Sequence, residues 1–229
     1  MKITKHKDMK KYIIIAAALL SLGSMTAGAV DLDSIGRDAK YVETIMQRST
    51  KVTDALKITG TARGKEVLNI VANRYFKLND IYTERDSIKA VAKTLTGNDK
   101  KQKMEYAEML KDQKLYKSHF GFIADLSVYL SEKEVETVKD VLTYNVVNVT
   151  YKAQCDMIPS LKLEEKVQIL AWLKEAREYA MDAESSKKKH EAFGKYKGRI
   201  NNWLSKRGYN LTKEREEWAK RVKARGGTL

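Results

Sequence analysis

The sequence predicts an all-α fold, most simply a multi-helix antiparallel bundle of about seven helices. Three observations support this class. The chain of 229 residues contains one proline, Pro159. It is rich in Lys, Glu, Ala, Leu and Met, which are good helix formers. Apolar residues recur at steps of three and four over long stretches, which is the period of one helix face.

The segment 1–29 is predicted to be a signal peptide. Lysines precede an apolar run, YIIIAAALLSLGSM, and Ala27 and Ala29 then occupy the small-residue positions of an A-x-A cleavage site. The run is shorter than a bilayer span, which favours a cleaved signal over an N-terminal anchor helix. No cysteine follows the run for lipid attachment. We therefore expect a periplasmic or secreted protein, 30–229, without a lipid anchor or a transmembrane segment.

Long amphipathic helices are predicted in the first part of this mature chain. Ser131 and Glu134 form a capping-box pattern, so a new helix is expected to begin there. The expected helices are 33–56, 65–95, 100–130 and 131–142.

The stretch 143–158 is expected to differ from its surroundings. It is rich in Val, Thr and Tyr, which favour strands, and it ends just before Pro159. We predict one extended or small two-stranded segment here. Cys155 lies within it and cannot form an internal disulfide because it is the lone cysteine. A small buried residue is favoured over a nucleophile.

The last part of the chain is predicted to be helical and basic. The region 185–229 carries 14 Lys and Arg against 4 Glu. We expect a single helical domain, 30–229, with this region as its basic C-terminal part, and leave its oligomeric state open. Because export argues against nucleic acid, the expected anionic partners are acidic polysaccharides, lipid head groups or cell-wall polymers; a solvated basic face is the alternative. The expected helices are 163–183, 187–206 and 212–225.

Two glycines lie one turn apart inside the expected helix 187–206, where each costs about 1 kcal/mol relative to alanine. They share a strip between the apolar and basic sides of the helix. One interpretation is close packing against another backbone. The other is the floor of a groove that binds a sugar or a carboxylate. The candidate ligand-binding residues are His190, Gly194, Lys195, Lys197, Gly198, Arg199, Asn201 and Asn202.

The block RYFKLNDIYTERD adds Arg74 and Arg85 among aromatic residues. An ion-pair network with later helices is the favoured interpretation, and Arg85 is also a candidate ligand clamp. The mature chain holds two histidines, His119 and His190, and no Cys cluster, so no metal site is expected. Nucleotide and hydrolase motifs are lacking, and no cofactor is expected.

Three blocks carry a resemblance: RYFKLNDIYTERD, VKDVLTYNVVNVTYKAQCDMIP and AREYAMDAESSKKKHEAFGKYKGRINNWLSKRGYNL. Together they resemble a domain of unknown function found in secreted proteins of glycan-degrading Gram-negative bacteria. The resemblance implies a helical exported protein encoded near polysaccharide-degrading enzymes. It implies no catalytic residue.

These observations favour an exported accessory protein that binds acidic glycan fragments in polysaccharide utilisation. A lyase or hydrolase is a second hypothesis, with His190 or a tyrosine (Tyr144, Tyr151 or Tyr196) as acid or base. A scaffold that binds an envelope partner through its basic C-terminal helix is a third. The sequence does not choose between a catalytic and a binding role.

Overall fold

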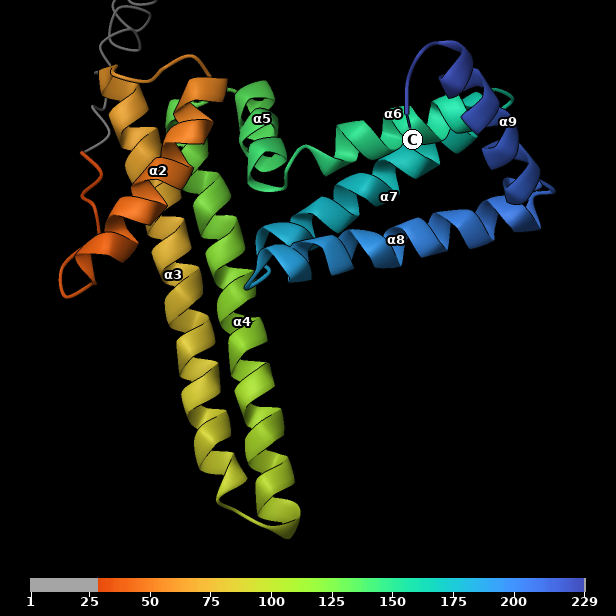
Figure 1. The fold of residues 1–229 in the computed structure, drawn as a ribbon. Coiled ribbons are helices and arrows are strands. Elements are labelled where there is room, and N and C mark those ends of the chain that lie inside the picture. The colour runs from red at the N-terminus through yellow and green to blue at the C-terminus, as the bar shows by residue number, and fades with distance from the viewer. Residues whose placement is uncertain (1–28, 229) are drawn as a thin grey trace, which may run out of the picture. The chain divides into compact units, whose positions relative to one another are not determined.

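The computed structural model describes residues 29–228, which form eight helices and no strand over that range (Figure 1). The predicted all-α fold is confirmed. The predicted signal peptide lies outside the described residues. Within the described range, no helix is both long and apolar enough to cross a bilayer. The helices are α2 (Ala39–Ala55), α3 (Ala62–Lys93), α4 (Gly97–Tyr129), α5 (Glu132–Leu142), α6 (Val146–Met157), α7 (Leu163–Met181), α8 (Ser186–Lys206) and α9 (Leu211–Ala224).

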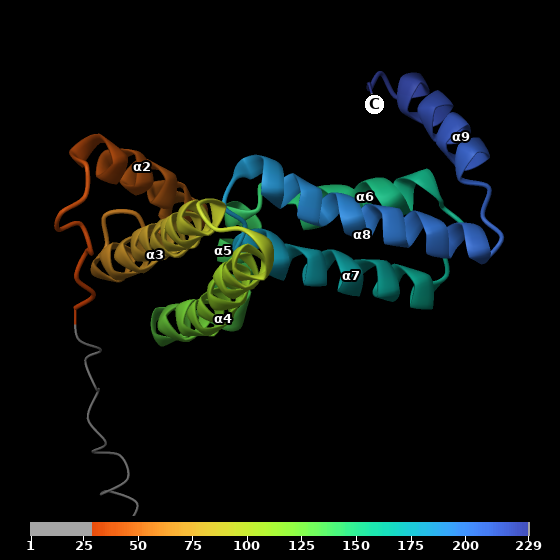
Figure 2. The ribbon, with the colours of Figure 1, turned by 90° about the horizontal axis from the view of Figure 1, so that it is seen from below.

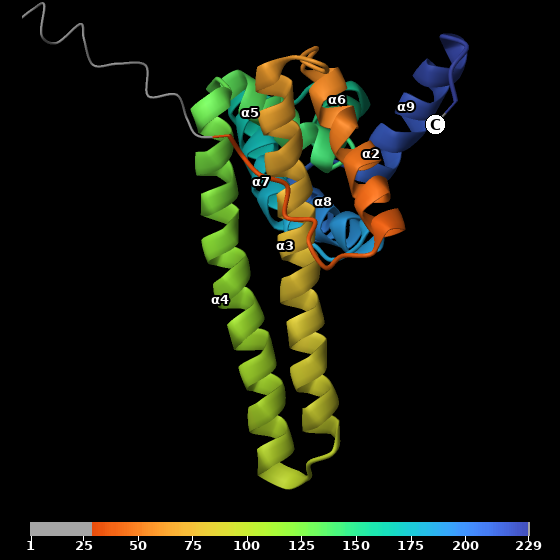
Figure 3. The ribbon, with the colours of Figure 1, turned by 90° about the vertical axis from the view of Figure 1, so that its left-hand side faces the viewer.

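The helices α3 and α4 form a long antiparallel pair, and α2 packs against α3 (Figures 1 and 3). An apolar cluster of Ile45, Ala72 and Phe76 joins α2 to α3. The short helix α5 contacts both α2 and α4. It begins at the predicted capping box, in which Ser131 and Glu134 each bond the other's backbone N–H. The arrangement brings the ends of α2, α3 and α5 close to one another.

The helices α6, α7 and α8 lie side by side around a second apolar core (Figure 2). On α8, Phe193, Ile200 and Leu204 recur at helical spacing and face this core. On α7, Ile169 and Leu173 do the same. Because each helix presents one apolar stripe, burial of these stripes holds the three helices together.

The prediction of an extended segment at 143–158 is wrong, because most of it forms α6. Val147, Tyr151 and Ile158 follow a helical period, and all three pack into the core of α7 and α8. This packing outweighs the strand propensity of the Val, Thr and Tyr residues, which is a weak preference. Cys155 is half-buried on α6 instead of fully buried. The extra helix raises the number from the expected seven to eight in the described range.

The last helix, α9, is held mainly by polar contacts to the end of α6. The Asp156 carboxylate accepts hydrogen bonds from Trp218 Nε1 at 2.7 Å and from Arg225 Nη2 at 2.7 Å. Arg221 donates to the Asp156 carbonyl oxygen at 2.9 Å. None of the residues Leu211–Ala224 is buried. One aspartate therefore carries most of the polar attachment of this helix.

Candidate functional site

A pocket lies where α2, α3, the end of α5 and the start of α8 come together. Its volume is about 590 Å³, within the range of small-molecule binding sites. We call it the α2–α8 pocket. Four tyrosines line it: Tyr41, Tyr75, Tyr82 and Tyr144. Three cationic side chains line it: Arg48, Lys51 and Lys189.

Helical spacing places the three cations in this wall. Arg48 and Lys51 are three residues apart on α2, so they share one face of that helix. Lys189 lies on the first turn of α8 in the same register as Phe193 and Ile200, which face the core. Its side chain is therefore carried inward, and Lys189 is only 7% exposed. Its Nζ donates a hydrogen bond to the Leu142 carbonyl oxygen at 2.8 Å.

The wall of the α2–α8 pocket carries excess positive charge. Glu184, an acidic residue of the wall, is paired with Arg85 at 2.7 Å. Within residues 29–228, no salt bridge joins Arg48, Lys51 or Lys189 to a carboxylate. Burial, followed by the positive charges of Arg48 and Arg74, lowers the pKa of Lys189 to about 8. A buried cation beside a second cation is costly, and an anion in the pocket would relieve that cost.

Aromatic rings surround the Lys189 ammonium group. Its Nζ lies 5.9 Å from the ring centroids of both Tyr75 and Tyr144. Burial raises the pKa of Tyr75, so its hydroxyl stays protonated at neutral pH. The Tyr144 ring also stacks on His190 at 5.5 Å between centroids. The pocket thus combines cations, hydroxyl groups and apolar ring faces.

The loop that carries Tyr144 has an unusual backbone. Tyr144 and Asn145 have φ angles of 58° and 56°, in the left-handed region that few residues other than glycine adopt. The Asn145 N–H donates to the Asp140 carbonyl oxygen at 2.7 Å, and Asn148 Nδ2 donates to Asn145 Oδ1 at 2.6 Å. These bonds hold the loop against the strain. The strained backbone keeps Tyr144 at the pocket wall.

The start of α8 adds polar groups to the same pocket. Ser185 caps the helix by accepting the N–H of Lys188 at 3.2 Å. Ser185 and Ser186 both line the pocket. The positive end of the helix dipole therefore reinforces the charge of the three cations.

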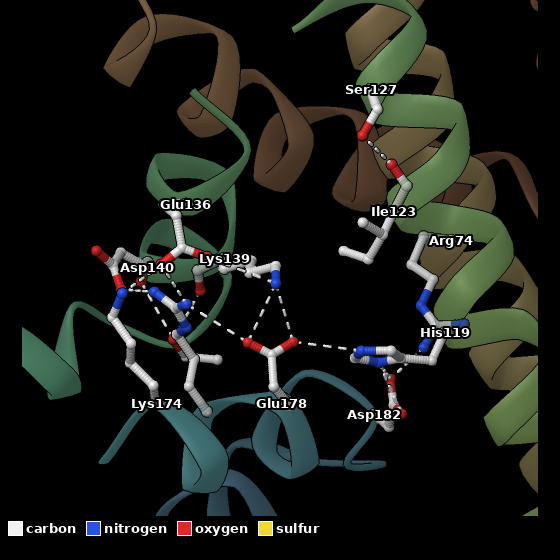
Figure 4. A network of polar contacts seen from close by, with 12 residues as sticks. Arg74, His119, Ile123, Ser127, Glu136, Lys139, Asp140, Lys174, Glu178 and Asp182 are labelled. Atoms are coloured by element: carbon white, nitrogen blue, oxygen red, sulfur yellow. Dashed lines mark hydrogen bonds and ion pairs between the residues drawn. The ribbon is translucent and has the colours of Figure 1, made fainter. Parts of the chain in front are cut away.

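A network of buried charges lies next to this pocket (Figure 4). Arg74 of α3 binds Asp182 at the end of α7. His119 of α4 places Nδ1 3.1 Å from Asp182 Oδ2 and Nε2 3.3 Å from Glu178 Oε2. Glu178 in turn contacts Lys139 of α5 at 3.2 Å. The network ties α3, α4, α5 and α7 together.

His119 is charged at neutral pH because of this network. The carboxylates of Asp182 and Glu178 raise the pKa of His119 to about 9. Although burial opposes it, His119 and Lys139 lower the pKa of Glu178 to about 2. The predicted ion-pair network between the second helix and later helices is confirmed by Arg74–Asp182 and Arg85–Glu184. Its charged groups pair with one another, although Arg74 Nε has no hydrogen-bond partner in the described part of the chain, and we assign the network a structural role.

Close packing at the two helix glycines is not found. An added Cβ at Gly194 or Gly198 would meet no heavy atom within 4 Å in the described part of the chain. Both glycines lie on the exposed side of α8. The packing interpretation of the glycine strip is therefore wrong. The glycines also lie outside the wall of the α2–α8 pocket.

The other sequence-predicted site residues do not converge on one place. His190 lies beside the α2–α8 pocket through its stack with Tyr144. Asn202 is exposed on α8. Arg85 and Lys195 line a second hollow of about 650 Å³ between α3, α4, α7 and α8. Its acidic groups balance its basic ones, as in the Arg85–Glu184 pair.

Three further predicted residues lie nearer the C-terminal end of α8. Lys197 and Asn201 line a hollow of about 880 Å³ beside α6 and α9. Arg199 stacks over the Trp172 ring at 4.5 Å and lies 3.7 Å from Glu175. The candidate strip is thus spread over several surfaces of the molecule.

Sequence reasoning missed Arg48, Lys51 and Lys189. Lys189 did have a signal in the sequence, because it occupies an apolar register position four residues before Phe193. A charged residue on the core face of a helix is unusual and needs a partner or a function. Arg48 had no such signal. Its place in the pocket depends on how α2 packs against α3.

Comparison with known proteins places most of the chain in one family. The model described as "Protein of unknown function (DUF3826)" matches residues 42–224. This match includes Arg48, Tyr75, Tyr144 and Lys189 of the α2–α8 pocket. The chain matches no curated protein. By its extent, the family match shows that the chain belongs to the DUF3826 family of proteins of unknown function.

Proposed function

We propose that this protein is an exported binding protein that holds an acidic glycan fragment in the α2–α8 pocket. One observation carries the proposal. Three cations without a carboxylate partner in the described residues line one pocket of about 590 Å³, among four tyrosines. Such a wall is complementary to a small ligand that has both a carboxylate and an apolar face.

The chemistry of a uronic acid fits each part of this wall. Its carboxylate would bind Arg48, because charge-assisted hydrogen bonds are the strong ones, and Lys189 would face another oxygen atom of the sugar. The apolar face of the sugar ring would pack on Tyr144 or Tyr75. The serine and tyrosine hydroxyl groups would exchange hydrogen bonds with the sugar hydroxyl groups. This division of roles is common in small-molecule sites, where a few polar groups orient a ligand that apolar surfaces enclose.

Export is supported by the sequence of the first 29 residues. Their basic, apolar and A-x-A regions are those of a signal peptide with cleavage after Ala29. The resemblance to secreted proteins of glycan-degrading bacteria supports the same setting. A periplasmic or secreted location would expose the pocket to oligosaccharides. The proposed glycan ligand therefore depends on the proposed export of the protein.

Titration calorimetry with uronate oligosaccharides and neutral analogues of equal length tests the proposal. We expect binding of the acidic series only, weakened by added salt. Arg48→Ala and Lys189→Met should each weaken binding about tenfold or more, which is the loss of one charge-assisted hydrogen bond. Absence of binding at millimolar concentration across the acidic series would overturn the proposal.

Arg199→Ala is the matched control. Arg199 lies on the same helix as Lys189 but stacks on Trp172, outside the α2–α8 pocket. We expect the Arg199→Ala variant to bind the uronate oligosaccharides with the same affinity as the wild type. If Arg199→Ala loses binding and Arg48→Ala does not, the ligand binds along the exposed strip of α8 instead. Cleavage of the oligosaccharides during the titration would favour a lyase or hydrolase over a binding protein.

A further inference from the structure

Lys189 has the surroundings of a reactive amine. Lys189 is 7% exposed, yet it is one of the residues that line the α2–α8 pocket. Of its three possible donor directions, one is used by the Leu142 carbonyl oxygen at 2.8 Å. Tyr75 and Tyr144 flank the nitrogen at 5.9 Å. A helix-capping contact alone does not require an aromatic pocket around the same nitrogen.

The charge around Lys189 favours the neutral amine. Arg48 and Arg74 are its charged neighbours that oppose protonation, and Asp182 is the neighbour that supports it. With a pKa of about 8, roughly a quarter of Lys189 is unprotonated at pH 7.5, against about one in a thousand for an ordinary lysine. A neutral amine is a nucleophile, and desolvation of a lysine in an aromatic pocket is a usual way to produce it.

Resting on the ligand site proposed above, we propose that Lys189 captures the carbonyl carbon of its ligand as an imine. The ligand class is then a carboxylate that also carries an aldehyde or ketone, such as the open-chain end of an acidic sugar. Arg48 holds the carboxylate, and Lys189 faces the carbonyl group across the same pocket.

The reaction balances without an oxidant or a reductant. Lys189 first loses a proton to solvent. The Nζ lone pair attacks the carbonyl carbon, a C–N bond forms and the C=O π bond opens, and a proton passes from the nitrogen to the oxygen to give a neutral carbinolamine. The hydroxyl group takes up the proton that Lys189 released at the start, the C–O bond breaks, water leaves, and the nitrogen lone pair forms the C=N bond of a protonated imine. Hydrolysis reverses every step, so capture is reversible.

Reductive trapping on the full chain tests the inference. Glyoxylate is the probe because it is a small molecule with both groups, and cyanoborohydride reduces the imine in place. We expect the mass of one N-carboxymethyl group, located on Lys189 by peptide mapping. Lys188 is the internal control, since it is exposed and paired with Glu191 at 2.8 Å. Labelling spread equally over Lys188 and Lys189 would overturn the inference.

Two variants and one pH profile sharpen the result. Arg48→Ala should reduce labelling of Lys189 about tenfold while Lys188 is unchanged. Lys189→Arg should abolish the specific label. Mapping of the wild-type chain needs neither variant to fold, and its labelling rate should rise with pH around 8, the pKa of Lys189. A rate that rises only near pH 10 would contradict the inference.

A ligand without a free carbonyl group separates the two proposals. The methyl glycoside of galacturonic acid carries the carboxylate but cannot form an imine. If it binds and glyoxylate leaves no adduct on Lys189, the imine inference fails and the proposed glycan site stands. If glyoxylate labels Lys189 and no uronate binds, the inference stands for another carbonyl acid and the glycan assignment fails.

Discussion

His119 is a residue whose charge contributes directly to the stability of the fold. It lies between Asp182 and Glu178, and its side chain is only 13% exposed. The two carboxylates raise its pKa from 6.5 to about 9. In this interval the folded protein holds a proton that the unfolded chain has released. His119 therefore stabilises the fold fully below pH 6.5, and this contribution is lost as the pH rises through 9.

We predict that the free energy of unfolding falls as the pH rises from 6.5 to 8. The loss should be about 1.5 kcal/mol, from the shift in the pKa of His119 and the proton linkage. From about pH 7 the titration of Lys189 acts in the opposite direction, because its pKa is lowered from 10.5 to about 8, and it offsets a few tenths of a kcal/mol of this loss by pH 8. Urea denaturation at pH 6.5 and pH 8 measures the slope.

His119→Gln is the control for this slope. Glutamine keeps a hydrogen-bond donor but cannot titrate, so the variant should be less stable at pH 6.5 and should lose the fall in stability between pH 6.5 and 8, leaving only the slight rise that Lys189 contributes. The same slope in His119→Gln would assign it to another group. The change lies in the network and away from the α2–α8 pocket wall.

Single residues were the hardest part of the site to predict. His190 and Lys189 are adjacent in sequence, but 100° around a helix separates their directions. The candidate strip included His190, which is exposed, and omitted Lys189, which is buried. The helical period of α8 distinguishes the buried Lys189 from the exposed His190. The same period could not identify Arg48, because no local pattern relates α2 to α8 across about 140 residues.

At the scale of elements, α8 carries a cost that nothing in the described structure offsets. Gly194 and Gly198 sit in the helix interior with open space where a Cβ would be. We predict that Gly194→Ala and Gly198→Ala each stabilise the protein by about 0.5–1 kcal/mol, because alanine loses less backbone entropy on folding. Chemical denaturation of the two single variants and the double variant measures this.

Gly64→Ala is the matched control for these substitutions. It is also a helical glycine, but an added Cβ would overlap the carbonyl oxygen of Ile58. We expect a loss of about 1–3 kcal/mol there. Destabilisation by the substitutions at Gly194 and Gly198 would instead indicate that another molecule approaches the α8 backbone at these positions.

The elements themselves were largely predictable. Capping at Ser131 and the long amphipathic periods predicted seven helices, six of them within three residues of their observed bounds, whereas the first begins at Ala39 and not at residue 33. The failure at α6 has a physical cause. Val146, Val147 and Val149 favour strands in isolation, but Val147 and Ile158 are buried against α7 and α8 at helical spacing. The prediction gave more weight to the strand propensity of these residues than to the helical spacing of the apolar residues in the same segment.

At the scale of the whole molecule, five of the fourteen basic side chains in the C-terminal part 185–229 form a salt bridge with a carboxylate among the described residues. Arg48, Lys51 and Lys189 line the α2–α8 pocket without a salt bridge to a carboxylate in the described residues. The five pairs are Lys188–Glu191, Arg199–Glu175, Arg207–Glu165, Lys220–Glu217 and Arg225–Asp156.

Export is a prediction for the whole chain. Expression in a Gram-negative host should yield a protein that begins at Val30, recovered outside the cytoplasm. Cell fractionation and N-terminal sequencing check this. Ala29→Tyr should block or shift the cleavage, because the cleavage site accepts small residues. A protein that keeps Met1 and remains in the cytoplasm would contradict export and the proposed access to glycans.

The attachment of α9 has a consequence for how the chain completes its fold. The helix contributes no buried residue among Leu211–Ala224, and Asp156 provides most of its polar contacts. As separate molecules, two such surfaces would associate only weakly. Because the linker 207–210 connects α9 to α8, the binding of α9 to the end of α6 is intramolecular, with an effective concentration in the millimolar range. α9 thus behaves as a tethered ligand of its own chain. The fraction of molecules in which α9 is bound to the end of α6 depends as much on the short linker as on the contacts of Asp156.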